Sequence, residues 1–123
     1  MTLVVDIATI LASVGIGTTG TDLFYSQMPP SPDDSVCAYQ YAGSPSLPEG
    51  ISQPGVQVRI RNSDYVTGAA KAKAVHDALH GYANTLLNGT YYLQIFANQY
   101  PEALGVDDND RHIFVVNFRV MMR

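Results

Sequence analysis

The N-terminal segment has apolar residues at helical spacing. Between residues 2 and 14 they recur at intervals of three and four positions, which places them on one face of a helix. These residues are Leu3, Ile7, Ile10, Leu11 and Val14. Thr2 is a suitable N-cap and Gly15 a suitable terminator. The pattern predicts an amphipathic helix over residues 2–14, whose apolar face must be covered by a sheet or another element.

A second helix is predicted in the middle of the chain. Asn62, Ser63 and Asp64 supply capping side chains, and an Ala-rich stretch then runs to about His80. Gly81 is placed for the C-terminal cap. The predicted inward face consists of Ala72, Val75, Ala78, Leu79 and Tyr82.

Alternation of apolar and polar residues marks the strands. Residues 56–61 alternate a Val/Ile face with a Gln/Arg face, which is typical of a strand with one buried and one exposed side. Thr90–Asn98 and Arg111–Met121 also alternate, and short runs at 23–28 and 35–41 predict two further strands. The final strand carries bulky apolar groups on both faces, so part of it needs cover from another subunit or from the N-terminal helix.

The order of these elements predicts the fold class. A helix, two or three strands, a second helix and two strands make a single domain over residues 1–123. We expect an α+β fold with a mixed, mostly antiparallel sheet of four to five strands and two helices packed on one face. The Pro-rich tract 44–54 is predicted to be a long ordered loop or an arm. Residues 86–89 are predicted as a turn, and residues 99–110 as an acidic connecting loop.

Composition excludes several classes of protein. The 123 residues are 46% hydrophobic and 15% charged, with a net charge of −4, as in an ordinary globular domain. The seven basic residues are dispersed apart from Arg59 and Arg61, so no basic cluster predicts binding to nucleic acid.

Asp6 interrupts the apolar N-terminal stretch, which is shorter than the ~20 residues of a membrane span. We therefore expect a cytoplasmic protein with no membrane partner. Cys37 is the single cysteine, so no intrachain disulfide is expected.

A glycine motif follows the first predicted helix. Gly15, Gly17 and Gly20 match Gly-x-Gly-x-x-Gly, but the dinucleotide-binding form of this motif follows a strand and opens a helix. Here a helix comes first and a strand follows. The glycines are therefore predicted to end the helix and form a turn.

Two histidines on the second helix admit two interpretations. His76 and His80 with Asp77 between them resemble the zinc-protease motif His-Glu-x-x-His, with His112 as the remaining histidine for a third ligand. Asp is one methylene shorter than the Glu of that motif. A small metal-dependent hydrolase is thus one alternative. In the other, both imidazoles lie on the helix surface and His80 interacts favourably with the helix dipole.

The acidic residues of the connecting loop do not fit a calcium loop. Counting from Asp107, the EF-hand spacing requires Gly and Glu where this chain has His112 and Phe118. Asp107, Asp108 and Asp110 are instead predicted to lie in a solvated turn, with an adventitious cation or an acidic contact surface as the alternatives.

Arg59 and Arg61 share one face of the strand 56–61 with Gln57. This strip is either an exposed sheet face or a site for phosphate, acidic side chains or a partner's loop. The second possibility would make the chain an anion-binding module.

Several short motifs stand in a fixed order over about residues 33–123. They are Pro32-Asp33 before the strand Val36–Tyr41 with Gly43, Val56–Arg61 before Asp64-Tyr65 and the Ala-rich helix, Gln99-Tyr100-Pro101, Leu104-Gly105, Asp107, Arg111, and the closing Asn117–Val120. Together they resemble the minor capsid, or tail terminator (tail completion), proteins of long-tailed bacteriophages. The glycine run 15–20 and the Pro-rich tract 44–54 depart from this resemblance.

The resemblance implies a structural virion protein of the tail and neck, assembled in the host cytoplasm, with no enzymatic activity and no cofactor. It implies a homo-oligomeric, hexameric ring at the head-proximal end of the tail. Such a ring ends polymerisation of the major tail tube protein and joins the tail to head-tail connector or stopper proteins. DNA would pass through its channel without sequence-specific binding. A connector or stopper role for the chain itself is the close alternative.

The same resemblance suggests which residues make contacts. The candidate subunit or partner contacts are Arg59, Arg61, Gln99, Tyr100, Pro101, Arg111 and Arg119. An acidic loop at the channel would keep DNA from adhering to the wall. We therefore expect Asp107, Asp108 and Asp110 to face the ring axis.

Overall fold

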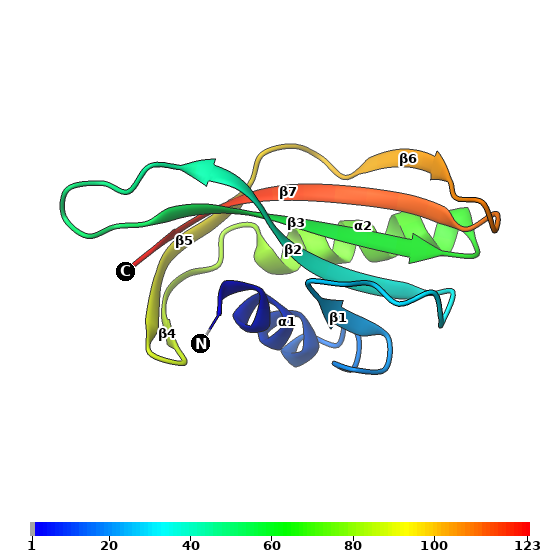
Figure 1. Cartoon of the computed structure of the whole chain (residues 1–123), viewed down its shortest axis with the longest axis horizontal. Helices are drawn as coiled ribbons and strands as arrows, with labels where there is room; N and C mark the ends of the chain where they lie inside the picture. The colour runs from blue at the N-terminus through cyan, green and yellow to red at the C-terminus, as the bar shows by residue number, and fades with distance from the viewer. Residues whose placement is uncertain (1) are drawn as a thin grey trace.

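A computed structural model describes residues 2–123 as a seven-stranded sheet with two helices on one face (Figure 1). The elements in chain order are α1 (Leu3–Ser13), β1 (Leu23–Tyr25), β2 (Ser35–Ser44), β3 (Gln53–Asn62), α2 (Tyr65–Leu79), β4 (Ala83–Leu87), β5 (Thr90–Ala97), β6 (Glu102–Val106) and β7 (His112–Met122). The predicted α+β class is confirmed. Within residues 2–123, no helix combines the length and the apolar character that crossing a membrane requires.

The sheet is mixed and mostly antiparallel, as predicted. Its strand order is β1-β2-β3-β7-β5-β4, and β6 also pairs with β7. Among the described strands, β1 and β2 form the one parallel pair. β3 runs along one edge of β7, while β6 and β5 share the other edge, β6 beside the start of β7 and β5 beside its end. β7 is therefore the central strand of the sheet.

Alternate residues of the central strands build the core. In β3 the inward residues are Val56, Val58 and Ile60, and in β7 they are Phe114, Val116, Phe118 and Val120. Residues from both helices belong to the same buried cluster. The opposite face of these strands carries Gln57, Arg59, Val115, Asn117 and Arg119. We call it the open face, because neither helix covers it (Figure 1).

α1 packs through an apolar face that also contains a carboxylate. Ile7 and Leu11 are fully buried, and so is Asp6. The Asp6 carboxylate accepts hydrogen bonds from the Tyr92 hydroxyl on β5 and, at 2.8 Å, from the Asn88 side-chain amide. A buried carboxylate is costly unless it is hydrogen-bonded, so these two donors fix α1 against the β4–β5 hairpin. Burial and the bond to Asp6 raise the pKa of the Tyr92 hydroxyl.

The glycines after α1 form a turn, as predicted. Gly15 and Gly20 have φ of 84° and 88°, a region that favours glycine. A Cβ on Gly17 would lie 2.7 Å from Oδ1 of Asp22, which also accepts a hydrogen bond from the Thr18 N–H at 2.7 Å. The motif therefore serves the local chain reversal between α1 and β1.

α2 begins at its predicted cap and lies close to the sheet. Oδ2 of Asp64 accepts a hydrogen bond from the Thr67 N–H at 2.8 Å, and this bond holds the pKa of Asp64 below its usual value. A Cβ on Gly68 would lie 2.5 Å from the Phe114 ring, so glycine permits the close approach. Tyr82 lies beyond the end of α2 and packs on the core from the following segment. The prediction that placed Tyr82 on the helix is therefore wrong.

The predicted four to five strands are too few. Leu86 and Leu87 of β4 fall in the segment predicted as a turn, and β6 falls in the predicted connecting loop. β4 precedes the turn, which is formed by Asn88 and Gly89 with φ of 51° and 84°, values that suit a tight hairpin. β6 lies inside the predicted connecting loop, and all of its residues are exposed. A fully exposed strand shows no alternation, so β6 is defined by its pairing with β7 alone.

The distal half of the β2–β3 hairpin projects beyond the rest of the sheet, at the left of Figure 1. We call residues 41–54 the arm. Its base is a bulge, where the β2–β3 register shifts between Gln40 and Gly43, and Gly43 has φ of 127°. A Cβ on Gly55 would lie only 2.0 Å from the Tyr41 carbonyl oxygen. Glycine at this position therefore allows the two strands to cross closely and sets the direction of the arm.

The tip of the arm is an ordered turn rather than an open loop. The N–H of Leu47 donates to the carbonyl of Ile51 at 2.7 Å, and the N–H of Gly50 donates to that of Leu47 at 3.2 Å. Ser52 and Met122 exchange backbone hydrogen bonds of 2.7 and 3.0 Å. The chain's last strand thus supports the returning side of the arm.

Candidate functional site

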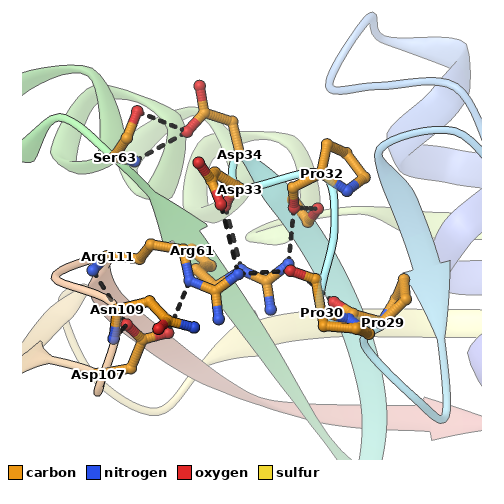
Figure 2. Close-up of polar contacts among 11 residues, drawn as sticks. Pro29, Pro30, Pro32, Asp33, Asp34, Arg61, Ser63, Asp107, Asn109 and Arg111 are labelled. Atoms are coloured by element: carbon orange, nitrogen blue, oxygen red, sulfur yellow. Dashed lines mark hydrogen bonds and ion pairs between the residues drawn. The ribbon is translucent and has the colours of Figure 1, made fainter.

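Several charged residues singled out in the sequence meet at one end of the sheet, shown in Figure 2. Residues 29–34, which we call the proline loop, lie there against the end of β3 and the start of β7. Arg61 is 6% exposed. Its Nε donates to the carbonyl of Asp33 at 3.0 Å, and its Nη2 donates to those of Pro29 and Pro32 at 2.8 and 2.7 Å. Because proline has no N–H, a proline-rich loop has few backbone donors of its own. Its carbonyls therefore need hydrogen-bond donors from outside the loop.

Arg111 holds the same loop from the β7 side. It is 8% exposed, and its Nη1 donates to the carbonyl of Pro30 at 2.5 Å and lies 3.5 Å from Oδ1 of Asp33. Its Nε donates to Oδ2 of Asp107 at 2.8 Å. We call Arg61 and Arg111 together the arginine clamp. Burial, together with the neighbouring Arg111, lowers the pKa of Arg61, although an arginine remains charged at any ordinary pH.

Asp107 organises the turn between β6 and β7. Its Oδ1 accepts from the N–H groups of Asn109 and Arg111 at 2.9 and 3.0 Å. These backbone donors and the Arg111 guanidinium hold the pKa of Asp107 below its usual value. Asp108 and Asp110 are exposed. Of the acids predicted to face a channel, Asp107 is therefore engaged within the chain, while the other two are exposed.

A further contact ties the proline loop to the start of α2. Oδ1 of Asp34 accepts from the N–H and the hydroxyl of Ser63, at 2.8 and 3.0 Å (Figure 2). The loop is thus anchored to β3, to β7 and to the cap of α2. Its sequence alone, with Pro29, Pro30 and Pro32, indicated only a break between strands.

The remaining predicted arginines lie on the open face. Arg59 is exposed, and its Nε donates to Oε1 of Gln57 at 3.0 Å. Gln57 in turn donates to Oδ1 of Asn117 on β7 at 3.0 Å. The guanidinium carbon of Arg119 lies 5.7 Å from the centre of the Phe96 ring. Arg59 and Arg119 are exposed, so a partner can reach them, whereas Arg61 is covered by the proline loop.

Gln99, Tyr100 and Pro101 precede β6, and two of them line a groove that sequence reasoning did not find. The groove has a volume of about 190 Å³. It is lined by Tyr65, Ala69, Lys73, Tyr100, Pro101, Ala103 and Phe114. Tyr65 and Tyr100 are 51% and 70% exposed. The only sign of this groove in the sequence is the pair Tyr65 and Tyr100. The two residues come close because β6 is a strand, which the sequence pattern does not indicate.

The histidines do not form one cluster. The rings of His76 and His80 stack with centroids 5.1 Å apart, and Nδ1 of His80 accepts from the N–H of Ala97 at 2.9 Å. His112 instead packs edge-on against Tyr65, at the opposite end of α2. Within residues 2–123, no group of three His, Cys, Asp or Glu side chains is placed to hold a metal ion. The arrangement of a metal hydrolase with His112 as third ligand is therefore wrong.

Comparisons with known proteins agree with this fold. The chain resembles a chain of the solved structure titled "Virion of native gene transfer agent (GTA) particle" with a TM-score of 0.61 and 21% identity, over 94% of this chain and 84% of that one. This similarity shows a shared fold. No curated protein matches the chain. A family model described as "Bacteriophage tail terminator protein" matches residues 10–122. Since this match covers nearly the whole chain, the protein belongs to the bacteriophage tail terminator family.

Proposed function

We propose that this structural tail protein acts as a terminator. Identical copies form a hexameric ring at the head-proximal end of the tail tube, stop its polymerisation and join the tail to the neck. The observation that carries the proposal is the family match over residues 10–122. The protein acts through binding surfaces, without catalysis or a cofactor.

The distribution of exposed surfaces supports a ring. A closed ring of identical copies needs two different contact surfaces on each copy. The chain offers the arm, the open face and the outer edge of β6 as separate surfaces. The backbone groups along the outer edge of a strand can pair with another chain. This protein therefore has more than one surface for a neighbour.

The predicted contact residues divide into two groups under this proposal. Arg59, Arg119 and the segment 99–101 make direct contacts with neighbouring subunits, with the major tail tube protein or with connector or stopper proteins. Arg61 and Arg111 act indirectly, because they fix the proline loop. This division makes the exposed residues the better targets for mutations that affect assembly but spare the fold.

The exposed acids suit a channel wall. Asp108 and Asp110 lie exposed at the β6–β7 turn. In the ring they face the axis and repel the phosphates of DNA that passes through without sequence-specific binding. Replacing both by Lys should leave the ring intact and make it retain DNA at low salt, with retention falling as salt rises. Rings that still release DNA freely would place these acids elsewhere.

Tube growth provides the direct test. The tail tube protein is polymerised with and without this protein, and the tubes are measured by electron microscopy. We expect a ring at one end of each tube and shorter tubes as the protein concentration rises. An equal concentration of an unrelated acidic protein is the control. Tubes that grow to the same length and carry no ring would contradict the terminator role.

A further inference from the structure

We propose that the arm of one copy docks into the groove between α2 and β6 of the next copy. This inference rests on the proposed ring and names the contact that closes it. It concerns two features that are exposed in the single chain: the tip of the arm around Leu47 and the aromatic groove.

The groove has the composition of a peptide-binding site. Tyr65 and Tyr100 form its exposed aromatic walls, and Phe114, which is 3% exposed, lies at its base. The small side chains of Ala69 and Ala103 leave room between them. Exposed tyrosines around a concave apolar surface are typical of protein contacts, because each ring buries a large area with few rotatable bonds.

The tip of the arm has the complementary chemistry. Its sequence is Pro45-Ser46-Leu47-Pro48, and Leu47 is 38% exposed in a turn closed by backbone hydrogen bonds. Proline residues fix φ and the turn fixes the tip, so little conformational entropy is lost when it binds. Pro-rich segments commonly bind grooves lined by aromatic side chains. Leu47 is therefore the apolar residue that we expect to enter the groove.

Charge supports the same pairing. Glu49 is the only charged residue between Gln40 and Val58, and it is exposed at the tip of the arm. Lys73 is the only charged residue among those that line the groove. Its side chain is 46% exposed while it pairs with Asp77 at 2.7 Å. Docking Leu47 would bring the carboxylate of Glu49 towards the Lys73 ammonium, which Glu49 would then share with Asp77.

The positions of the two features favour a neighbouring copy. In Figure 1 the arm projects at the left, while β6 and the start of α2 lie towards the right. A contact between unlike surfaces at opposite ends of a molecule is heterologous, and repetition of such a contact generates a ring when the rotation closes. The occupant of the groove is thus a second copy of this chain.

A cysteine pair tests the contact directly. Leu47→Cys and Ala103→Cys are introduced together, with buried Cys37 left in place. Mild oxidation of the assembled protein should give a ladder of linked chains up to the ring size, which a reductant removes. The control pair, Leu47→Cys with Thr9→Cys, uses an exposed position on α1. Absence of the ladder from a protein that does form rings would overturn the docking and leave the terminator role standing.

Two complementary variants test the direction of the contact. Leu47→Asp damages only the arm, and Ala103→Glu damages only the groove; both positions are exposed in the single chain. We expect each variant to weaken self-association more than ~10-fold, measured by sedimentation with and without tail tubes. An equimolar mixture should form heterodimers, because the intact arm of Ala103→Glu can dock into the intact groove of Leu47→Asp. The second contact of each pair is damaged on both sides, so no ring closes. If Leu47→Asp forms rings as the wild type does, the docking is overturned and the ring is not. If the wild type itself stays monomeric on tail tubes, the ring is overturned as well.

Discussion

The two ends of the β2–β3 hairpin are built on different principles. At one end the buried guanidinium of Arg61 donates to three carbonyls of the proline loop, and Arg111 adds a fourth. At the other end the arm is exposed and is held mainly by backbone pairing and glycine geometry. One end contributes stability, and the other presents a surface. A single hairpin can therefore be changed at its arm with little effect on the fold.

The largest effect is expected from Arg61→Met. The substitution removes the donor of three hydrogen bonds and leaves loop carbonyls unsatisfied, which we expect to lower the free energy of unfolding by roughly 3–5 kcal/mol. Urea denaturation measures the loss. Arg59→Met on the same strand is the matched control, because Arg59 is exposed, and its cost should stay within about 0.5 kcal/mol. Equal losses in the two variants would mean that the buried Arg61 stabilises the fold no more than the exposed Arg59 does.

A smaller effect is expected from Gly55→Ala at the base of the arm. The new Cβ would lie 2.0 Å from the Tyr41 carbonyl oxygen, so the strands must separate locally. We expect a loss of about 1–3 kcal/mol and backbone NMR shifts that are confined to residues 40–56. Ser46→Ala, at an exposed position in the arm, is the control and should change neither. Shifts that spread to the arginine clamp would show that the two ends are coupled.

Acid should weaken the clamped end selectively. The folded-state pKa of Asp107 is depressed by the Arg111 and Asn109 N–H groups and by the Arg111 guanidinium. Its contribution to stability is therefore present above the ordinary carboxyl pKa of about 3.9 and is lost as pH falls through the lower folded-state value. Asp107→Asn should reduce the fall in urea midpoint between neutral and acid pH. Asp108→Asn is the control. If both variants show the same fall in urea midpoint as the wild type, Asp107 makes no pH-dependent contribution to stability.

The smallest effect on folding is expected from Leu47→Asp. Leu47 is 38% exposed at the arm tip, so the free energy of unfolding should change by less than about 0.5 kcal/mol. Thermal unfolding of the free chain measures this. A large loss would mean that the arm tip supports the domain, and would remove the contrast between the two ends.

The parts of the fold that could be predicted are those with a buried and an exposed side. β3 alternates Val56, Val58 and Ile60 with polar residues because only one face meets the core. β6 has no buried side, so its five residues carried no such pattern. The groove could not be predicted either, because it exists only where β6 brings Ala103 close to α2.

The arginine clamp shows a second limit of sequence reasoning. The alternation of side chains along β3 correctly placed Arg59 and Arg61 on the same face of the sheet. It gave no information about which residues cover that face. Arg61 is buried by carbonyls from residues that lie about thirty positions earlier. Those carbonyls belong to the backbone, so no side-chain pattern in the sequence identified them as partners.

The buried carboxylate of Asp6 has a consequence for the order of events during synthesis. Its hydrogen-bond donors, Asn88 and Tyr92, lie 82 and 86 positions later in the chain. α1 leaves the ribosome first, yet its Asp6 stays without these donors until β5 has also emerged. Because burying an unpaired carboxylate is costly, we expect α1, the first of these elements to be made, to dock in its final place only after β5 has been translated.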